Sequence, residues 1–241
     1  MIEKFFTEAV LVGIIASGIR LATPYLYASI GETFGQRSGV LNLGVEGQML
    51  LGAFAAFYVS LTTGNLWFGL LAAMLTGLIM GLGMAFVSIN LQAVQGISGI
   101  GFYLFGLGLS DLLFQKLMGT VVTVSGFRPI YFPVLSDLPI VGQIFFNHNI
   151  LVYGAYAMVF VAWFVLNKTT LGLKIKAVGE SPEAADSLGV SVSKIRYLTI
   201  SFGGMMSGIA GASLSIALLN VFQQNMTSGL GFIAVALVYF G

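Results

Sequence analysis

The chain has no cysteine and a single histidine, His148, among its 241 residues. Without cysteine there can be no disulfide, thiol nucleophile or thiolate metal site, and one histidine cannot build a histidine-based metal centre. The sequence also lacks the phosphate-binding pattern G-x-x-x-x-G-K-[ST] and the hydrolase patterns H-E-x-x-H and G-x-S-x-G. It therefore gives no support for an enzyme, for a metal site or for a chain that binds ATP by itself.

Charge is scarce as well. Charged residues make up 8% of the chain and the net charge is +1, which gives no electrostatic case for nucleic acid. Neither Gly47–Ser110 nor Tyr197–Gly241 contains an Asp, Glu, Lys or Arg. Because a spanning helix needs about 20 apolar residues, these stretches have room for several. We predict an all-α, polytopic transmembrane helical bundle, in which pairs such as Gly77–Gly81 and Gly204–Gly208 let helices pack closely.

The apolar runs divide the chain into spans. Six are long enough to cross a bilayer, near 5–28, 40–62, 66–90, 95–118, 149–167 and 195–219. A seventh begins near residue 229, and its 13 residues up to Gly241 are too few to cross. We expect residues 1–241 to form a single transmembrane domain without its C-terminal spans.

Two polar, glycine-rich interruptions, 31–48 and 89–101, predict discontinuous helices. In membranes such breaks occur where they are buried in protein or line a wet cavity, and they often form transporter sites. The candidates for contact with a neutral polar solute are Asn42, Glu46, Asn90, Gln95, Ser98 and Asn220. For each of them a hydrogen bond between helices is the simpler alternative, and for Glu46 the alternative is a structural cap.

One stretch is unlike the rest. Residues 168–196 hold five of the ten Lys and Arg residues, and the positive-inside rule places this loop in the cytoplasm. Within it, Ser181 is a natural N-cap, Pro182 suits the first helical position, and Glu183 favours the positive end of the helix dipole. Gly189 can close the helix in the left-handed conformation. A helix this short is marginal in water, so we expect it to dock on a cytoplasmic protein, unless it is an ordinary capped turn.

The sequence TTLGLKIKAVGESPEAADSLGVSVSKIRYLTISFGGMMSGIAGA resembles the cytoplasmic loop and following helix of ABC-importer permeases. The resemblance is to the permeases that serve branched-chain amino acids, simple sugars and nucleosides. GQRSGVLNLGVEGQMLLGAFAAF is similar to the nucleoside branch of that family, and GLGFIAVALVYFG resembles its next segment. The residues that match the coupling helix of the family are Gly179, Glu180, Pro182, Glu183, Ala184, Ala185 and Gly189.

The resemblance implies a multi-pass permease subunit of the bacterial plasma membrane, which imports a nucleoside or related compound. It also implies three partners besides membrane lipid and the solute: a cytoplasmic ABC ATPase that binds ATP and magnesium, a second homologous permease, and an extracytoplasmic substrate-binding lipoprotein that sets most of the specificity. No cofactor is expected in this chain. Simple sugars, branched-chain amino acids or a vitamin are the alternative solutes. An ion-coupled secondary transporter is the alternative of another class, although it should bury more carboxylates than Glu46 and Asp111.

Overall fold

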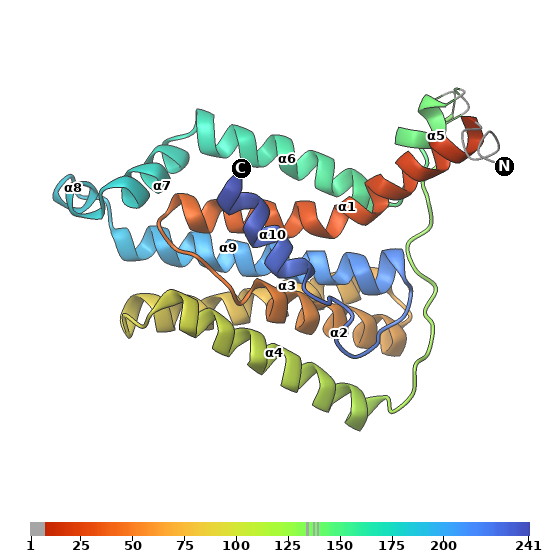
Figure 1. The fold of residues 1–241 in the computed structure, drawn as a ribbon, viewed down its shortest axis with the longest axis horizontal. Coiled ribbons are helices and arrows are strands. Elements are labelled where there is room, and N and C mark those ends of the chain that lie inside the picture. The colour runs from red at the N-terminus through yellow and green to blue at the C-terminus, as the bar shows by residue number, and fades with distance from the viewer. Residues whose placement is uncertain (1–7, 134, 137, 139) are drawn as a thin grey trace.

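The computed structural model describes residues 8–133, 135–136, 138 and 140–241 (Figure 1). Six helices are long and apolar enough to cross a membrane, which confirms the polytopic helical bundle. In chain order the elements are α1 (Glu8–Arg37), α2 (Val45–Thr63), α3 (Leu66–Ala85) with the π-helix η2 (Phe86–Asn90), α4 (Gln95–Leu117), α5 (Val141–Phe145), α6 (Ile150–Lys168), α7 (Thr170–Glu180), α8 (Pro182–Ser187), α9 (Val192–Ser213) with the π-helix η3 (Leu214–Leu218), and α10 (Leu230–Phe240).

Helix α9 is the core of the bundle, and α1, α2 and α3 pack around it. Glycines permit this packing. A Cβ atom at Gly204 or Gly208 would overlap the backbone of α3, and one at Gly81 would lie 2.9 Å from the carbonyl oxygen of Ile200. The two glycine pairs therefore serve close helix contact, as their spacing predicts.

The first interruption is shorter than the predicted range 31–48, because α1 stays helical through Arg37. Gly31 does not break the helix: a Cβ there would lie 2.8 Å from the Cβ of Met206 on α9, so this glycine serves packing. The non-helical segment is residues 38–44, which we call the α1–α2 turn. The second interruption is also shorter than the predicted range 89–101, because α4 is helical from Gln95; η2 and residues 91–94 separate α3 from α4.

Two units, each made of a helix, a break and a second helix, run in opposite directions in the bundle. Helices α1 and α9 run antiparallel, and α2 and α10 each follow one of them after a break (Figure 1). The N-termini of α2 and α10 meet inside the bundle, where a Cβ on Gly231 would lie 2.6 Å from the backbone nitrogen of Glu46. Discontinuous helices paired in this way are a common arrangement in transporters.

The two ends of the bundle differ in charge. One end, which we call the basic end, carries the α1–α2 turn, α7 and α8 (Figure 1). It holds Arg37, Lys168, Lys174, Lys176, Lys194 and Arg196. The opposite end carries the N-terminal part of α1 and the described residues between α4 and α6, which include α5 (Figure 1).

Candidate functional site

A protruding pair of helices, α7 and α8, forms the predicted coupling segment (Figure 1). Helix α7 begins with a side-chain cap, since the hydroxyl of Thr169 accepts a hydrogen bond of 3.2 Å from the backbone N–H of Gly172. Its inner face buries Ile175 and Val178, which join Ile195 of α9 in one apolar cluster. This cluster holds the segment on the bundle.

Helix α8 starts where the sequence predicts. Ser181 occupies the N-cap position and Pro182 the first turn, although the Ser181 hydroxyl makes no capping hydrogen bond. Glu183 lies in the first turn, where its negative charge is favourable to the helix dipole. The start of α8 therefore depends on the fixed backbone angle of Pro182 and on Glu183 rather than on a serine cap.

The end of α8 is closed by Gly189, whose φ of +81° confirms the predicted left-handed conformation. The backbone N–H of Gly189 donates to the carbonyl of Asp186 at 2.8 Å, and that of Val190 donates to the carbonyl of Ala185 at 3.0 Å. These two bonds form a Schellman motif. They fix the end of a helix that is too short to be stable alone.

One face of α8 has no partner among the described residues. Ala185 is buried against α7 and α9, whereas Glu183, Ala184 and Leu188 are exposed. Leu188 is 84% exposed, which is unusual for a leucine in a polar segment. Of the seven residues that match the family's coupling motif, all except Ala185 are thus at least partly exposed, and the exposed side of α8 lies at the tip of the segment.

The coupling segment touches the α1–α2 turn directly. Gly179 lies against the end of α1, where any side chain would overlap the carbonyl oxygen of Arg37. Arg196 Nε donates to the carbonyl of Ser38 at 3.2 Å, and the Ser38 hydroxyl lies 2.8 Å from that of Thr199. The end of α7 and the start of α9 therefore both contact the α1–α2 turn directly.

Buried side chains organise the α1–α2 turn itself. The backbone N–H of Asn42 donates to Glu32 Oε1 at 3.1 Å, and that of Leu41 donates to Gln95 Oε1 at 2.9 Å. The Asn42 side chain accepts from the N–H of Gly44 at 3.0 Å and donates to Gln48 Oε1 at 3.3 Å. Asn42 and Gln95, two of the solute candidates, thus bind the protein backbone at this turn.

Glu46 joins the two helix breaks. Its side chain is 1% exposed, and its two carboxylate oxygens accept hydrogen bonds from the backbone N–H groups of Gly229 at 2.7 Å and Gly231 at 2.6 Å. A carboxylate on the N-terminus of α2 therefore satisfies the N-terminal donors of α10. This geometry is the structural cap that was the alternative for Glu46, and the helix it caps is α10.

The other solute candidates are dispersed. Asn90 accepts a hydrogen bond of 2.5 Å from the hydroxyl of Tyr197 near the basic end. Ser98 donates to the carbonyl of Val94 within its own helix and borders an apolar pocket with Phe102. Asn220 follows η3 and lines a cavity at the opposite end of the bundle. The structure thus does not gather the six candidates in one site.

That cavity, which we call the polar cavity, has a volume of about 460 Å³. Arg20 of α1, His148 and Asn149 before α6, and Asn220 line it together with Phe127. Asn149 is fully engaged, since its Oδ1 caps α6 at 3.1 and 3.2 Å and its Nδ2 donates to the carbonyl of Ala217.

Two buried polar atoms at the polar cavity have no partner among the described residues, His148 Nδ1 and Asn220 Oδ1. His148 Nε2 lies 2.7 Å from the carbonyl oxygen of Ile144, which can only accept, so Nε2 carries the proton and Nδ1 is an acceptor. Burial lowers the pKa of His148 below 6.5, and the nearby positive charge of Arg20 lowers it further. The cavity is therefore lined by a neutral histidine and an asparagine beside a cationic donor, and two buried acceptors of its lining residues have no partner among the described residues.

Sequence reasoning missed three parts of this arrangement. Helix α7 was treated as loop, although Thr169 followed by Leu171, Ile175 and Val178 has the cap and spacing of an amphipathic helix. The link from Arg196 to Ser38 and the polar cavity carry no local signal, because they join residues far apart in the chain.

A helical membrane bundle with discontinuous inner helices and a protruding, end-capped helix at its basic end is the architecture of a transport subunit. The chain belongs to the family described as branched-chain amino acid transport system / permease component, whose model matches residues 14–241. It is accordingly a permease subunit of an ABC transporter and a multi-pass membrane protein, not an enzyme. Such permeases work with an ATPase and a substrate-binding component.

Relatives with assigned names are also ABC transporter permeases. The chain is 43% identical to the putative glucose ABC transporter permease protein TsgC13 of Haloferax volcanii over 232 residues, which cover 95% of this chain and 70% of the relative. It is 35% identical to the guanosine ABC transporter permease protein NupQ of Bacillus subtilis, over 95% of this chain and 75% of the relative. Identity to the nucleoside ABC transporter permease protein NupC of Lactococcus lactis is 33%, with the same coverage. No solved structure matches the chain significantly.

Proposed function

We propose that this permease imports a neutral solute that carries a sugar ring, and that its preferred solute is a nucleoside. The observation that supports the proposal is the lining of the polar cavity, which combines Arg20, His148 and Asn220. Ring hydroxyls of a sugar both donate and accept hydrogen bonds, so they suit a lining with a guanidinium and an amide. Two relatives are named for guanosine and for glucose, and both of these solutes carry a hydroxylated sugar ring, a five-membered ribose in guanosine and a six-membered ring in glucose.

The orientation follows from charge. Six of the ten Lys and Arg residues lie at the basic end, so we place that end in the cytoplasm and the polar cavity on the outer side of the membrane. The exposed side of α8 then faces a cytoplasmic ABC ATPase, which binds the ATP and magnesium. A second homologous permease and an extracytoplasmic binding lipoprotein complete the importer, in the bacterial plasma membrane.

Uptake by the complete importer in vesicles tests the solute. We expect labelled guanosine to enter with ATP inside, and entry to persist with an uncoupler. Unlabelled nucleosides should compete, whereas 2′,3′-dideoxyguanosine and free guanine should compete at least ten-fold more weakly because they lack the hydroxyls. Competition by glucose alone would assign the simple-sugar alternative. Competition by leucine alone, or uptake abolished by the uncoupler at constant ATP, would contradict the proposal.

A matched pair of variants tests the cavity. Asn220 and Asn225 both have positive φ, 57° and 52°, so alanine strains the backbone equally at either position, but only Asn220 lines the cavity. Asn220→Ala should raise the apparent KM for guanosine five-fold or more, as expected for a lost hydrogen bond of about 1 kcal/mol, and Asn225→Ala should not. Equal effects of the two would show that strain, not solute contact, is responsible.

The absence of cysteine makes the orientation directly measurable. Leu188→Cys on α8 introduces one exposed thiol at the basic end, and Val121→Cys, at a position 59% exposed in the native chain, introduces one at the opposite end. A membrane-impermeant maleimide should label Cys at 188 only from the cytoplasmic side, with protection when the ATPase is bound, and Cys at 121 only from outside. The reverse pattern would overturn the orientation and the docking of α8.

A further inference from the structure

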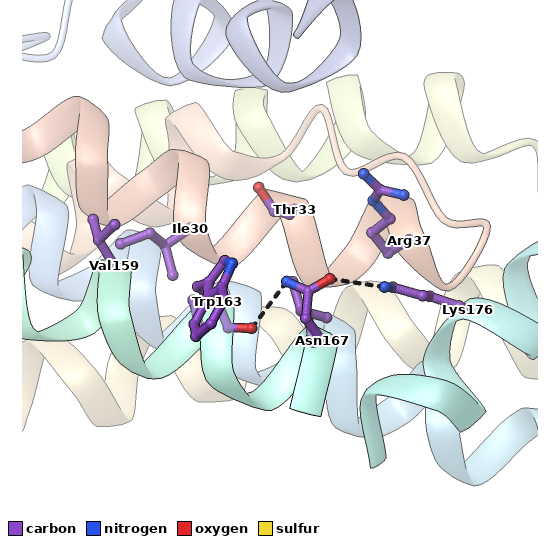
Figure 2. A pocket seen from close by; sticks show the side chains of 9 residues that line it. Ile30, Thr33, Arg37, Val159, Trp163, Asn167 and Lys176 are labelled. Atoms are coloured by element: carbon purple, nitrogen blue, oxygen red, sulfur yellow. Dashed lines mark hydrogen bonds between the residues drawn. The ribbon is translucent and has the colours of Figure 1, made fainter. Parts of the chain in front are cut away.

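A groove at the basic end lies apart from the polar cavity and from the exposed side of α8. Helices α1, α6 and α7 enclose it, and its volume is about 280 Å³. Figure 2 shows Ile30 and Val159 at one end of the groove, Arg37 and Lys176 at the other, and Trp163 between them. Its lining thus changes from apolar to cationic toward the basic end of the bundle.

The positive charge at the cationic end is not balanced by a negative charge of the groove's lining. None of the residues that line the groove is acidic. The acid of α1 nearest in sequence, Glu32, is buried and accepts hydrogen bonds from the backbone N–H of Asn42 and from Gln36 Nε2. Among the residues that the structure describes, Lys176 Nζ donates only to Asn167 Oδ1, at 3.0 Å, so most of its hydrogen-bonding capacity is free for a ligand.

The aromatic side chain marks the depth of the groove in the membrane. Trp163 is 56% exposed, and Lys168 Nζ lies 5.8 Å from its ring centroid. Exposed tryptophans with neighbouring lysines are typical of the level of lipid head groups. The apolar wall then lies at the level of acyl chains and the two cations at the level of phosphates.

We propose that this groove binds one anionic phospholipid, with its phosphate between Arg37 and Lys176 and its glycerol and first acyl carbons along Trp163 and Ile30. Basic pockets between transmembrane helices are sites for anionic head groups. The volume lies just below the roughly 300–1,000 Å³ of pockets that enclose whole small ligands, which suits a head group whose chains remain in the bilayer. The lipid would join α6 and α7 to α1 beside the coupling segment.

The two tryptophans of the chain provide a matched test. Trp67 lies on α3 at the opposite end and is 55% exposed, almost the same as Trp163, but it does not line the groove. In the full chain, W67F leaves Trp163 as the reporter and W163F leaves Trp67. Each is reconstituted in phosphatidylcholine vesicles that contain either brominated phosphatidylglycerol or brominated phosphatidylcholine, and quenching of fluorescence is measured against lipid fraction.

We expect Trp163 to be quenched at a lower fraction of phosphatidylglycerol than of phosphatidylcholine, and Trp67 to be quenched equally by both. Removing one cation, by Arg37→Gln or Lys176→Gln in the W67F chain, should raise the half-quenching fraction roughly five-fold, and Arg37→Lys should restore it. Lys174→Gln makes the same charge change on the exposed side of α7, outside the groove, and should have no comparable effect.

Three results would overturn the proposal. Equal quenching of Trp163 by the two lipids would mean that only ordinary boundary lipid lies there. An equal effect of Lys174→Gln and Lys176→Gln would mean a diffuse surface attraction. Relief of the phosphatidylglycerol quenching by millimolar glycerol 1-phosphate, with no relief by sodium chloride at the same ionic strength, would assign the groove to a soluble phosphate compound. None of these measurements depends on transport, so their outcome is independent of the proposed solute.

Discussion

The contact between Glu46 and the start of α10 yields the sharpest prediction. Gly229 and Gly231 donate to its carboxylate at 2.7 and 2.6 Å, in a place where the side chain is 1% exposed. Hydrogen bonds to a charged group contribute about 1.5–3 kcal/mol each. Glu46→Ala removes both and leaves two buried donors without a partner, so we expect the free energy of unfolding to fall by roughly 3–6 kcal/mol.

Glu46→Gln separates the two bonds. The amide oxygen can still accept from one glycine, but the amide NH₂ then faces the N–H of the other, and two donors cannot pair. We therefore expect about half of the loss. Gly231→Ala tests the same contact by bulk, because its Cβ would lie 2.6 Å from the backbone nitrogen of Glu46; overpacking of this kind costs about 1–3 kcal/mol.

The assay is unfolding by sodium dodecyl sulfate in mixed micelles, combined with hydrogen exchange at residues 229–231. Glu183→Ala is the control, since that carboxylate is exposed on α8 and should change stability by less than about 0.5 kcal/mol. If Glu46→Ala unfolds within about 1 kcal/mol of the unmodified chain and exchange at 229–231 is no faster, then Glu46 does not hold α10 and the reasoning is refuted.

Three further predictions concern the coupling segment and His148. Gly189→Val, in a residue with φ +81°, should strain the end of α8 by roughly 1–2 kcal/mol and, like Glu183→Lys, should reduce transport relative to ATP hydrolysis in the reconstituted importer; unchanged coupling in both variants would leave α8 an ordinary capped turn. Gly179→Ala places a Cβ on the carbonyl of Arg37 and should likewise lower the ratio of solute transported to ATP hydrolysed, whereas Gly13→Ala, with open space around its Cβ, should not. Burial lowers the pKa of His148 in the folded state below 6.5, so the neutral imidazole's contribution to stability is complete above about pH 6.5 and is lost as the pH falls below that value. The melting temperature should therefore be lower at pH 5.5 than at pH 7.5, and His148→Gln should reduce this difference. An equal difference in the variant would contradict this cause.

The spans were predictable because a membrane-spanning helix is determined by consecutive residues of the sequence and needs no information about distant contacts. A run of about 20 apolar residues without charge has few other structures available to it. The end of α8 was predictable for a similar reason, since a left-handed residue after a short helix favours glycine. In both cases the determining interaction lies within a few residues of the sequence that carries it.

The end of α1 was not predictable from the same kind of signal. Glycines at 31 and 35 resemble a helix break, yet Gly31 is helical and lets α9 approach. Whether a glycine breaks a helix or allows another helix to pack depends on what lies opposite, and that information is in the distant residue Met206. The partners of Glu46 were hidden for the same reason, because Gly229 and Gly231 follow it by more than 180 positions.

The contacts define a continuous route from the exposed side of α8 to the middle of the bundle. Helix α7 rests on the end of α1 through Gly179, the start of α9 holds the α1–α2 turn through Arg196, and the turn leads into α2, whose Glu46 holds α10. Contiguity alone does not establish coupling, which requires an element with two arrangements that both ends bias. The contact of Glu46 with α10 is the best candidate, because it joins two broken helices and consists of two hydrogen bonds that a small shift of α2 would break together. Close packing and the hydrogen bonds of Asn42, Gln48 and Glu46 account for the glycines and buried polar side chains that gather at residues 38–48 in an otherwise apolar chain.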